Sequence, residues 1–569
     1  MPITSGAGRM WWRSWSRFSC KGGFGGRLLA RRSEWDITRE CHKATTFEGL
    51  RRCAFSWRIR EISSFPLENS KEDAIAVRME LGHLLVRAKL ITVEQMNDAL
   101  KRQAAQGGRF GDHVIALGYM SQEALDAFIH RTPVEPESIE GTGIDENELL
   151  GLLIKLIYTW RLESPREFAD AIKLPAHIVV KLVRIASERK LIYAKGVRSE
   201  NSAAMNYALT DEGQRWAMEA LTRSQYTGPA PVPLDEYNER VNLQKITNEV
   251  VTFQRVRDNM TDLSMEDTLI EQSGPALNSG RAILLYGPPG NGKTTFAMRL
   301  ANVFTDMIYI PYAVTVEGQI IRVFDPSIHV PIANAAGAEN GFSLLRSQSV
   351  DARWLPCKRP FVVAGGELTL EMLDLRYDQT SKFYEAPLHM KALGGCFVID
   401  DFGRQLVSPS TLLNRWIVPL ESRVDYLKLH TGKSFSIPFE ELVIFSTNLE
   451  PEDLMDPAFL RRLPYKIEIG APSLDIYKRI FTKECLAHGI MLTDEVFAAI
   501  VYKIRQEKEL DLAAYQPKFL LEQVVAACRF MERPPSLEAR FLNYAIDNLR
   551  VKRNAEVADP LESLVRAGN

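Results

Sequence analysis

The residues best suited to chemistry lie in one stretch, residues 286–295, which reads YGPPGNGKTT. Because glycine has no side chain, the three glycines of this stretch allow the backbone to curl until successive N–H groups point at phosphate oxygens. Lys293 would meet the β- and γ-phosphates of a nucleotide as a point charge, and the hydroxyl of Thr294 would reach Mg²⁺. The predicted nucleotide ligands are Gly287, Pro288, Pro289, Gly290, Asn291, Gly292, Lys293, Thr294 and Thr295.

Two further stretches end in polar residues of the kind that phosphate chemistry requires. The apolar run 395–399 is followed by Asp400 and Asp401, which would serve the Mg²⁺ shell and the attacking water respectively. The apolar run 442–447 is followed by Asn448, which would orient water or sense the γ-phosphate. The alternative for each run is a strand that ends in an ordinary turn.

A pair of arginines, Arg461 and Arg462, closes a short predicted helix that begins near Asp456. Guanidinium groups at this place would reach the nucleotide of a neighbouring subunit. The alternative is a helix end that carries cations because they suit its dipole. The predicted catalytic residues are Asp401, Asn448, Arg461 and Arg462, and the predicted metal ligands are Thr294 and Asp400.

These residues need a parallel sheet to bring them together. Residues 282–285 read as a buried strand and residues 296–301 as a helix, so strand, glycine loop and helix come in the order that a phosphate site requires. In open α/β sheets the ligand lies at the carboxyl ends of the strands. The predicted fold class is therefore α/β, with a parallel sheet behind the phosphate-binding loop.

Taken together, residues 287–294, 400–401, Asn448 and 461–462 resemble the motifs of the AAA+ ATPases, over roughly residues 245–550. The resemblance implies ATP and Mg²⁺ as ligands, ATP hydrolysis, and a homo-oligomeric ring, commonly of six subunits, with an arginine acting in trans. It also implies a core at residues 245–470 and a helical lid with a C-terminal tail at residues 471–569.

Within the lid, residues 474–486, 494–505, 517–531 and 537–549 read as helices. Lys518 lies near the start of the third, where the AAA+ resemblance implies a second sensor arginine that contacts the nucleotide. Lysine stands there instead.

Asp401 is another departure from the resembled family, which has glutamate after the metal-binding aspartate. Its side chain is one methylene shorter, and a water-positioning group displaced by about 1 Å can lower the rate by orders of magnitude. We expect slow hydrolysis, or a backbone that advances to compensate. A nucleotide-dependent scaffold without turnover is the alternative.

The chain is long enough for several domains: it has 569 residues, and single cores rarely grow beyond about 250–300 residues. Its 70 Lys and Arg residues nearly balance its 72 Asp and Glu residues, which argues against a general nucleic-acid coat protein. The longest apolar runs, such as residues 149–160, are too short to cross a bilayer of about 30 Å. No membrane span is expected.

Seven cysteines, at positions 20, 41, 53, 357, 396, 485 and 528, form no Cys-X-X-Cys pair. An odd number of scattered cysteines fits reduced thiols better than a disulfide framework or a zinc site. The expected location is therefore the cytoplasm.

Residues 1–75 are basic and show neither a helical nor a strand period. They predict a disordered extension or a wrongly chosen start codon rather than a transit peptide, which would be amphipathic. Residues 81–92 are then repeated at residues 110–121, and each copy leads into a helix capped by Thr92 or Ser121. The pattern predicts a helical two-repeat module over residues 76–132.

This module resembles the N-terminal domain of type II secretion and type IV pilus extension ATPases. The resemblance implies a site for cyclic di-GMP with an arginine before each Leu-Gly or Phe-Gly pair. Here Glu80 stands in the first copy and Arg109 in the second, so such an arginine is available once. A helical module that docks a protein is the alternative.

Residues 145–224 read as helix, helix, helix, two strands and helix, which looks like a winged helix. Its second paired helix would present His177, Lys181 and Arg184 to DNA, but the helix is mostly aliphatic and the basic footprint is weak. Protein docking is therefore favoured over DNA reading. Residues 225–244 contain alternating prolines and predict a semi-rigid linker that keeps the N-terminal modules away from the core.

About ninety residues separate the phosphate-loop helix from Asp400, more than one crossover needs. Residues 314–324 predict a β-hairpin, and residues 361–370 an extended segment. The aromatic residues in 382–385 suit either the pore of a ring or, more commonly, a buried pair.

These patterns predict an ATPase that remodels or assembles a protein client, with pilus or secretion assembly as a setting suggested by analogy. A DNA-acting ATPase that uses the winged helix is the second hypothesis. It predicts binding that weakens steeply with salt.

Overall fold

The computed structural model describes residues 81–549, apart from residues 89, 108, 198–204, 333–349 and 455. The basic extension at residues 1–75 and the end of the chain after residue 549 lie outside the described residues. The chain forms two units, Met1–Val77 and Arg78–Asn569. The account below concerns the second.

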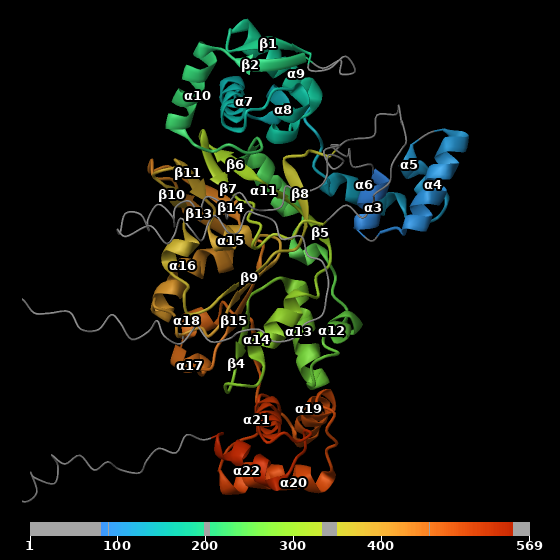
Figure 1. Ribbon diagram of the computed structural model, residues 1–569, viewed down its shortest axis with the longest axis vertical. Coiled ribbons are helices and arrows are strands. Elements are labelled where there is room, and N and C mark those ends of the chain that lie inside the picture. Colours follow the sequence, from blue (N-terminus) through green and yellow to red (C-terminus); the bar gives the residue numbers. More distant parts are fainter. Residues whose placement is uncertain are drawn as a thin grey trace, which may run out of the picture. The chain divides into compact units, whose positions relative to one another are not determined.

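A five-stranded parallel sheet forms the centre of the nucleotide-binding region, as the sequence predicts (Figure 1). Its strands, in spatial order, are β16 (Tyr465–Glu468), β4 (Ile283–Tyr286), β15 (Leu442–Ser446), β12 (Cys396–Ile399) and β9 (Phe361–Ala364). The expected extended segment at residues 361–370 is thus shorter and pairs with β12 at the edge of this sheet. Because all neighbours run in parallel, the three predicted polar strand ends meet at one edge.

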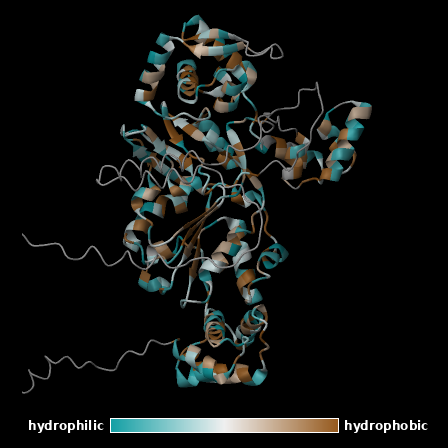
Figure 2. Cartoon of the chain, viewed as in Figure 1, coloured by the Kyte–Doolittle hydropathy of each residue, from teal (hydrophilic) through white to brown (hydrophobic). Residues whose placement is uncertain are grey.

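Both faces of the central strands β4, β15 and β12 are covered, which explains why these strands are almost entirely apolar (Figure 2). Successive residues of a strand point to opposite faces. Ile444 packs on one side with helix α14 (Lys293–Ala301) and helix α13 (Asp267–Ser279). Phe445 packs on the other side against Trp416 of helix α16 (Pro409–Ser422).

The four predicted lid helices are present and share one hydrophobic core. They are α19 (Leu474–Ala487), α20 (Asp494–Tyr502), α21 (Gln516–Phe530) and α22 (Ala539–Asp547), and a π-helical turn, Lys503–Glu507, extends α20. Tyr477 and Phe481 of α19 are fully buried in this core. The lid therefore has a core of its own.

Four strands of the long segment between α14 and Asp400 form a second five-stranded sheet together with one strand from before α14. Its order is β10 (Arg376–Asp378), β11 (Phe383–Glu385), β7 (Gln319–Arg322), β6 (Ala313–Val316) and β3 (Val232–Pro233). Two antiparallel pairs accompany it. One pairs β5 (Met307–Pro311) with β8 (Trp354–Lys358), and the other is the hairpin of β13 (Val424–Lys428) with β14 (Ser434–Pro438). The predicted hairpin is confirmed as β6–β7.

The aromatic residues of β11 pack inside the protein. Tyr384 is 1% exposed and its ring lies 4.9 Å from that of Tyr377. The ring of Phe383 packs edge-on against Tyr226. The buried interpretation of these aromatic residues is therefore the correct one in this structure.

The prolines of residues 225–244 do not form a separate spacer, contrary to expectation. Tyr226, Ala230 and Val232 are buried, β3 pairs with β6, and helix α11 (Leu234–Leu243) begins directly after β3. Proline favours the same extended backbone in a spacer and in a strand, and at the edge of a sheet its missing N–H is no handicap. Only the pairing of β3 with β6 shows that this segment is a strand and not a spacer.

A buried arginine just before β8 holds this proline-containing segment in place. Arg353 and Asp351 are almost completely buried, with 2.7 Å between Nη2 and Oδ2. Arg353 also donates from Nη1 to the carbonyl oxygens of Thr142 and Pro231, at 3.0 Å and 3.3 Å. One guanidinium thus joins three separate segments of the chain.

We expect Arg353→Met to lower the free energy of unfolding by about 3 kcal/mol, because it leaves the Asp351 carboxylate buried without its partner. Urea unfolding of the full chain measures the loss. The double variant with Asp351→Leu, which removes both charges, should recover most of it. An equal loss in the single and double variants would mean that packing, and not the unpaired charge, causes the effect.

The elements predicted for residues 145–224 occur in the expected order. They are α7 (Glu146–Trp160), α8 (Pro165–Ile172), α9 (Ala176–Glu188), β1 (Ile192–Val197), β2 (Met205–Leu209) and α10 (Asp211–Arg223). The side chains of Ser164 and Glu167 form a capping box at α8. The assignment of this region as a winged helix stays a prediction.

Lys155 lies inside this region, 5% exposed, and donates from Nζ to the Ser224 carbonyl oxygen at 3.0 Å. Burial lowers the pKa of Lys155 from 10.5 to about 8. Below pH 8 the folded state therefore carries a buried charge. Between pH 8 and 10.5 the unfolded chain binds more protons at Lys155 than the folded chain does. The free energy of unfolding therefore rises with pH over this range.

We expect Lys155→Met to stabilise α7 by about 1–3 kcal/mol at pH 7, and to stabilise it less at pH 9.5. Native-state hydrogen exchange of α7 at the two pH values measures the difference. The exposed Lys181→Met serves as the control and should show no such pH dependence. A gain that is the same at both pH values would contradict the argument.

Four helices follow one another in the predicted repeat region: α3 (Leu81–Arg87), α4 (Val93–Gln106), α5 (Phe110–Ala116) and α6 (Gln122–Arg131). Their assignment as a two-repeat module stays a prediction. Thr92 and Ser121 cap α4 and α6 as predicted. A Cβ added at Gly82 would lie 3.0 Å from Met96 and Phe110, and one added at Gly111 would lie 2.8 Å from Leu125. Close packing of the helices therefore accounts for both glycines without a ligand.

Candidate nucleotide-binding site

The phosphate loop follows β4 and leads into α14, and its glycines hold a backbone that other residues would strain. Gly287, Gly290 and Gly292 have φ values of 131°, 82° and 86°. A Cβ added at Gly287 would lie 2.5 Å from the carbonyl oxygen of Ile469. The loop is therefore closely packed against the chain that follows β16, and glycine is required at its first position.

Lys293 is the first residue of α14 and is 5% exposed. Its Nζ donates to the carbonyl oxygens of Gly287 and Pro288, both at 2.9 Å. Burial lowers the pKa of Lys293, while the nearby carboxylates of Asp401 and Asp400 oppose this shift. The ammonium group thus lies over the loop, where the first N–H groups of α14 also favour an anion.

Thr294 and Asp400 meet although they are far apart in the sequence. The Thr294 hydroxyl lies 2.9 Å from both carboxylate oxygens of Asp400. Thr294 is in the first turn of α14, and Asp400 directly follows β12. The structure therefore brings together the two predicted metal ligands.

Asp401 and Asn448 also meet, across the ends of β12 and β15. The side-chain amide of Asn448 donates to Oδ1 of Asp401 at 2.8 Å. Asp401 has a φ of 48°, in the left-handed region. Aspartate enters that region more readily than glutamate, so the local backbone gives a reason for the shorter acid at this position.

The loop that carries both acids is held by two residues that no sequence motif marks. Gln405 donates from Nε2 to the Asp400 carbonyl oxygen at 3.0 Å and accepts from the Gly403 N–H at 2.8 Å. The Thr447 hydroxyl donates to the Phe402 carbonyl oxygen at 2.8 Å. Gln405 and Thr447 thus fix the backbone on either side of Asp401.

The two arginines differ in their surroundings. Arg461 ends helix α18 (Pro457–Leu460) and is exposed. Arg462 is half-buried, with Nη2 3.2 Å from Oε2 of Glu421 on α16. Neither is enclosed by its own subunit, and Arg461 is the better placed of the two to reach a neighbouring molecule.

Lys518 is not brought to the phosphate loop by any described contact. Its side chain is 67% exposed and lies 3.9 Å from Glu522 on the same helix. The lid residues that touch the phosphate loop come before Lys518 in the sequence. The N–H of Ala514 donates to Oδ1 of Asn291 at 3.1 Å, and the N–H of Tyr515 donates to the Gly290 carbonyl oxygen at 2.9 Å.

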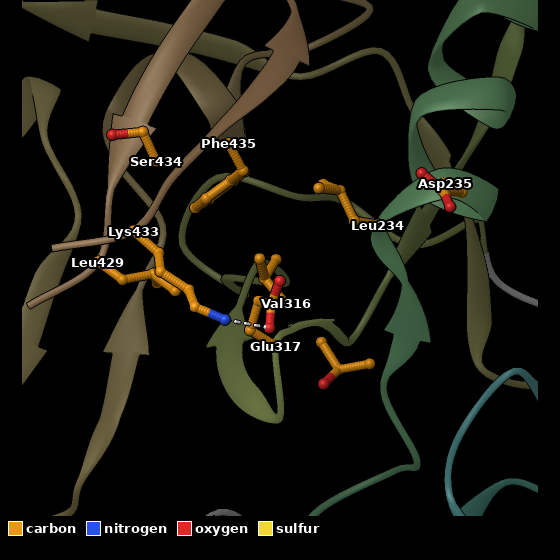
Figure 3. A pocket seen from close by; sticks show the side chains of 9 residues that line it. Leu234, Asp235, Val316, Glu317, Leu429, Lys433, Ser434 and Phe435 are labelled. Carbon is orange, nitrogen blue, oxygen red and sulfur yellow. Dashed lines mark hydrogen bonds and ion pairs between the residues drawn. The ribbon is translucent and has the colours of Figure 1, made fainter. Parts of the chain in front are cut away.

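A cavity of about 380 Å³ lies elsewhere, between the start of α11, the β6–β7 hairpin and the β13–β14 hairpin. Leu234, Val316 and Phe435 point into it, and Lys433 reaches across to Glu317 at 2.6 Å (Figure 3). Its lining contains none of the predicted nucleotide ligands.

The described residues offer neither a cluster of metal-ligating side chains nor a membrane-spanning helix. No group of three or more His, Cys, Asp or Glu side chains that could hold a metal ion was found there. No helix in the same part of the chain is long and apolar enough to cross a bilayer. Cys357, Cys396, Cys485 and Cys528 are free and buried.

Comparison with known proteins gives one family model and one curated relative. Residues 473–548, which contain the four lid helices, match a model described as a domain of unknown function (DUF8689). Over 412 residues the chain is 22% identical to a protein of Kocuria rhizophila described as an AAA ATPase forming ring-shaped complexes. The match covers 72% of this chain and 62% of that relative, so the chain spans less than two thirds of the relative's length.

Among solved structures, the chain is similar to a mutant of RuvB from Thermotoga maritima and to NtrX from Brucella abortus in complex with ATP. The RuvB match has a TM-score of 0.28 at 12% identity and covers 54% of this chain and 73% of that one. The NtrX match has a TM-score of 0.30 at 12% identity and covers 63% and 65%.

Proposed function

We propose that the protein is an ATPase of the AAA+ type that binds ATP with Mg²⁺ and acts as a ring on a protein client. The observation that carries the proposal is the Thr294 hydroxyl, 2.9 Å from both oxygens of Asp400, in the helix turn that also holds Lys293. A hydroxyl, a carboxylate and a buried ammonium beside a curled glycine loop form the set that a magnesium triphosphate requires.

The donor set fits Mg²⁺. This ion takes oxygen ligands and is usually held by one or two carboxylates together with substrate phosphates and water. Thr294 and Asp400 would hold it, and when bound it neutralises charge on the β- and γ-phosphates. The loop amides would bind the phosphates, and Lys293 would exchange its two carbonyl acceptors for phosphate oxygens.

Asp401 would position the attacking water. One of its oxygens accepts from Asn448 at 2.8 Å, which leaves the other oxygen to accept from water. We propose slow hydrolysis by this pair rather than a scaffold without turnover.

The ring is tested by mixing two inactive variants. Arg461→Ala and Asp400→Asn should each hydrolyse ATP poorly, but a mixture should regain part of the wild-type rate, because a site between an intact Asp400 and a neighbour's intact Arg461 then exists. Phosphate release at fixed total protein measures the regain. A mixture no faster than the two variants alone would contradict a shared site.

A protein client is favoured over DNA by the surroundings of α9. A ring nitrogen of His177 lies 3.0 Å from the Glu137 carbonyl oxygen, and Arg184 pairs with Glu188 at 2.8 Å. These two candidate DNA readers are therefore already engaged within the protein. ATP hydrolysis that rises when DNA is added, and loses that rise as salt increases, would reverse this preference.

The proposal extends neither to pilus or secretion assembly nor to cyclic di-GMP. Gly82 and Gly111 are explained by helix packing, so these glycines of the repeat call for no dinucleotide.

A further inference from the structure

The cavity between α11, the β6–β7 hairpin and the β13–β14 hairpin combines an apolar interior with charged residues at its edge (Figure 3). Leu234, Val316 and Phe435 point into it, one from each of these elements. Its volume of about 380 Å³ lies within the range of about 300–1,000 Å³ that is usual for ligand pockets. The interior therefore has room for a large apolar side chain.

The charged residues of this cavity leave one carboxylate without a counterion. Lys433 and Glu317 neutralise each other, with 2.6 Å between Nζ and Oε2. Asp235 also lines the cavity and is exposed, and it forms no ion pair in the part of the chain that the structure describes. Glu239, one helical turn further along α11, is exposed as well. Because residues four apart lie on the same side of a helix, this wall of the cavity attracts a cation.

Strand β14 presents a free edge to the cavity. Among the described strands it pairs only with β13. On its other edge the side-chain amide of Asn238 donates to the Ser436 carbonyl oxygen at 3.3 Å. Backbone groups two residues apart in an antiparallel strand point to the same edge, so the N–H and carbonyl groups of Ser434, which lines the cavity, point there too. An edge of this kind can pair with an added extended segment.

We propose that this cavity binds an extended segment of a protein client that has a large apolar side chain next to a lysine or arginine. The inference rests on the proposed action on a protein client. The segment's backbone would pair with β14 at Ser434, and its apolar side chain would contact Leu234 and Phe435. Its cation would meet Asp235. A free strand edge serves a peptide backbone and not a small molecule, which is why a peptide is the favoured ligand.

Selection from a phage library of random peptides on the immobilised full chain tests the site. The enriched peptides should carry a large apolar residue next to lysine or arginine. Fluorescence anisotropy then measures the binding of the most enriched peptide. Leu234→Trp fills the cavity and should lower the affinity about tenfold. Asp235→Lys replaces attraction by repulsion and should lower it by a similar factor, and that loss should shrink as salt is added.

Helix α19 of the lid supplies matched controls, because it begins with leucine and aspartate as α11 does. Leu474→Trp and Asp475→Lys should bind the selected peptide as tightly as the wild type. Lys433→Ala frees the Glu317 carboxylate from its ion pair and should raise the affinity about threefold. Damage to the fold would not produce such a gain.

Selected peptides without this apolar and basic pattern, or with equal affinity for the wild type and Leu234→Trp, would overturn the site while leaving the ATPase proposal intact. Self-association that is lost in Leu234→Trp but kept in Leu474→Trp would assign the cavity to a second copy of this chain and overturn the peptide site. Phosphate release from Mg-ATP reports on the proposed function separately. It should be unchanged in Leu234→Trp, and its absence in the wild type would contradict the ATPase and not the peptide site.

Discussion

Lys293→Ala is expected to weaken ATP binding about 1000-fold and to reduce phosphate release to background. The ammonium is the one group of the loop that carries a full positive charge, and it is 5% exposed. A charge beside the phosphates in such surroundings contributes several kcal/mol to their binding. Isothermal titration with Mg-ATP measures the affinity, and a coupled phosphate assay measures the turnover.

Arg299→Ala is the matched control for Lys293→Ala. Arg299 lies on the same helix, but its guanidinium pairs with Asp262 at 2.9 Å near the surface, so both affinity and turnover should stay at wild-type values. Equal phosphate release by the wild type and by Lys293→Ala would show that the loop does not support hydrolysis, and the ATPase proposal would fail.

Asp401→Asn is expected to lower turnover about 1000-fold while the affinity for Mg-ATP stays within a few-fold of the wild type. The change keeps the oxygen that accepts from Asn448 at 2.8 Å but removes the base that would take a proton from water. Single-turnover hydrolysis measures the chemical step, and titration with ATP measures binding.

Asp401→Glu completes this comparison. Because residue 401 has a left-handed φ, the longer acid should not raise the rate, although the resembled family has glutamate at the corresponding position. A wild type that binds ATP but turns over no faster than Asp401→Asn would favour the scaffold. A glutamate variant faster than the wild type would show that the short side chain, and not the backbone, limits the reaction.

Local sequence signals were enough to predict most of the elements and most residues of the candidate site. Caps at Thr92, Ser121 and Ser164 are local signals, because each side chain bonds to its own first helical turn. Asp400 and Asn448 could be predicted because each follows an apolar run that ends in a polar residue, and parallel strands bring such ends to one edge. Lys293 and Thr294 come from a motif that is contiguous in the chain.

The tertiary structure alone decided what depends on contacts between distant segments. Pro233 favours an extended backbone in a spacer and in a strand alike, so only pairing of β3 with β6 makes it part of a sheet. The left-handed turn at Asp401 is held by Gln405 and Thr447, whose roles no local pattern marks. Tyr515, and not Lys518, meets the phosphate loop, because the packing of the lid fixes which residues of α21 face Gly290.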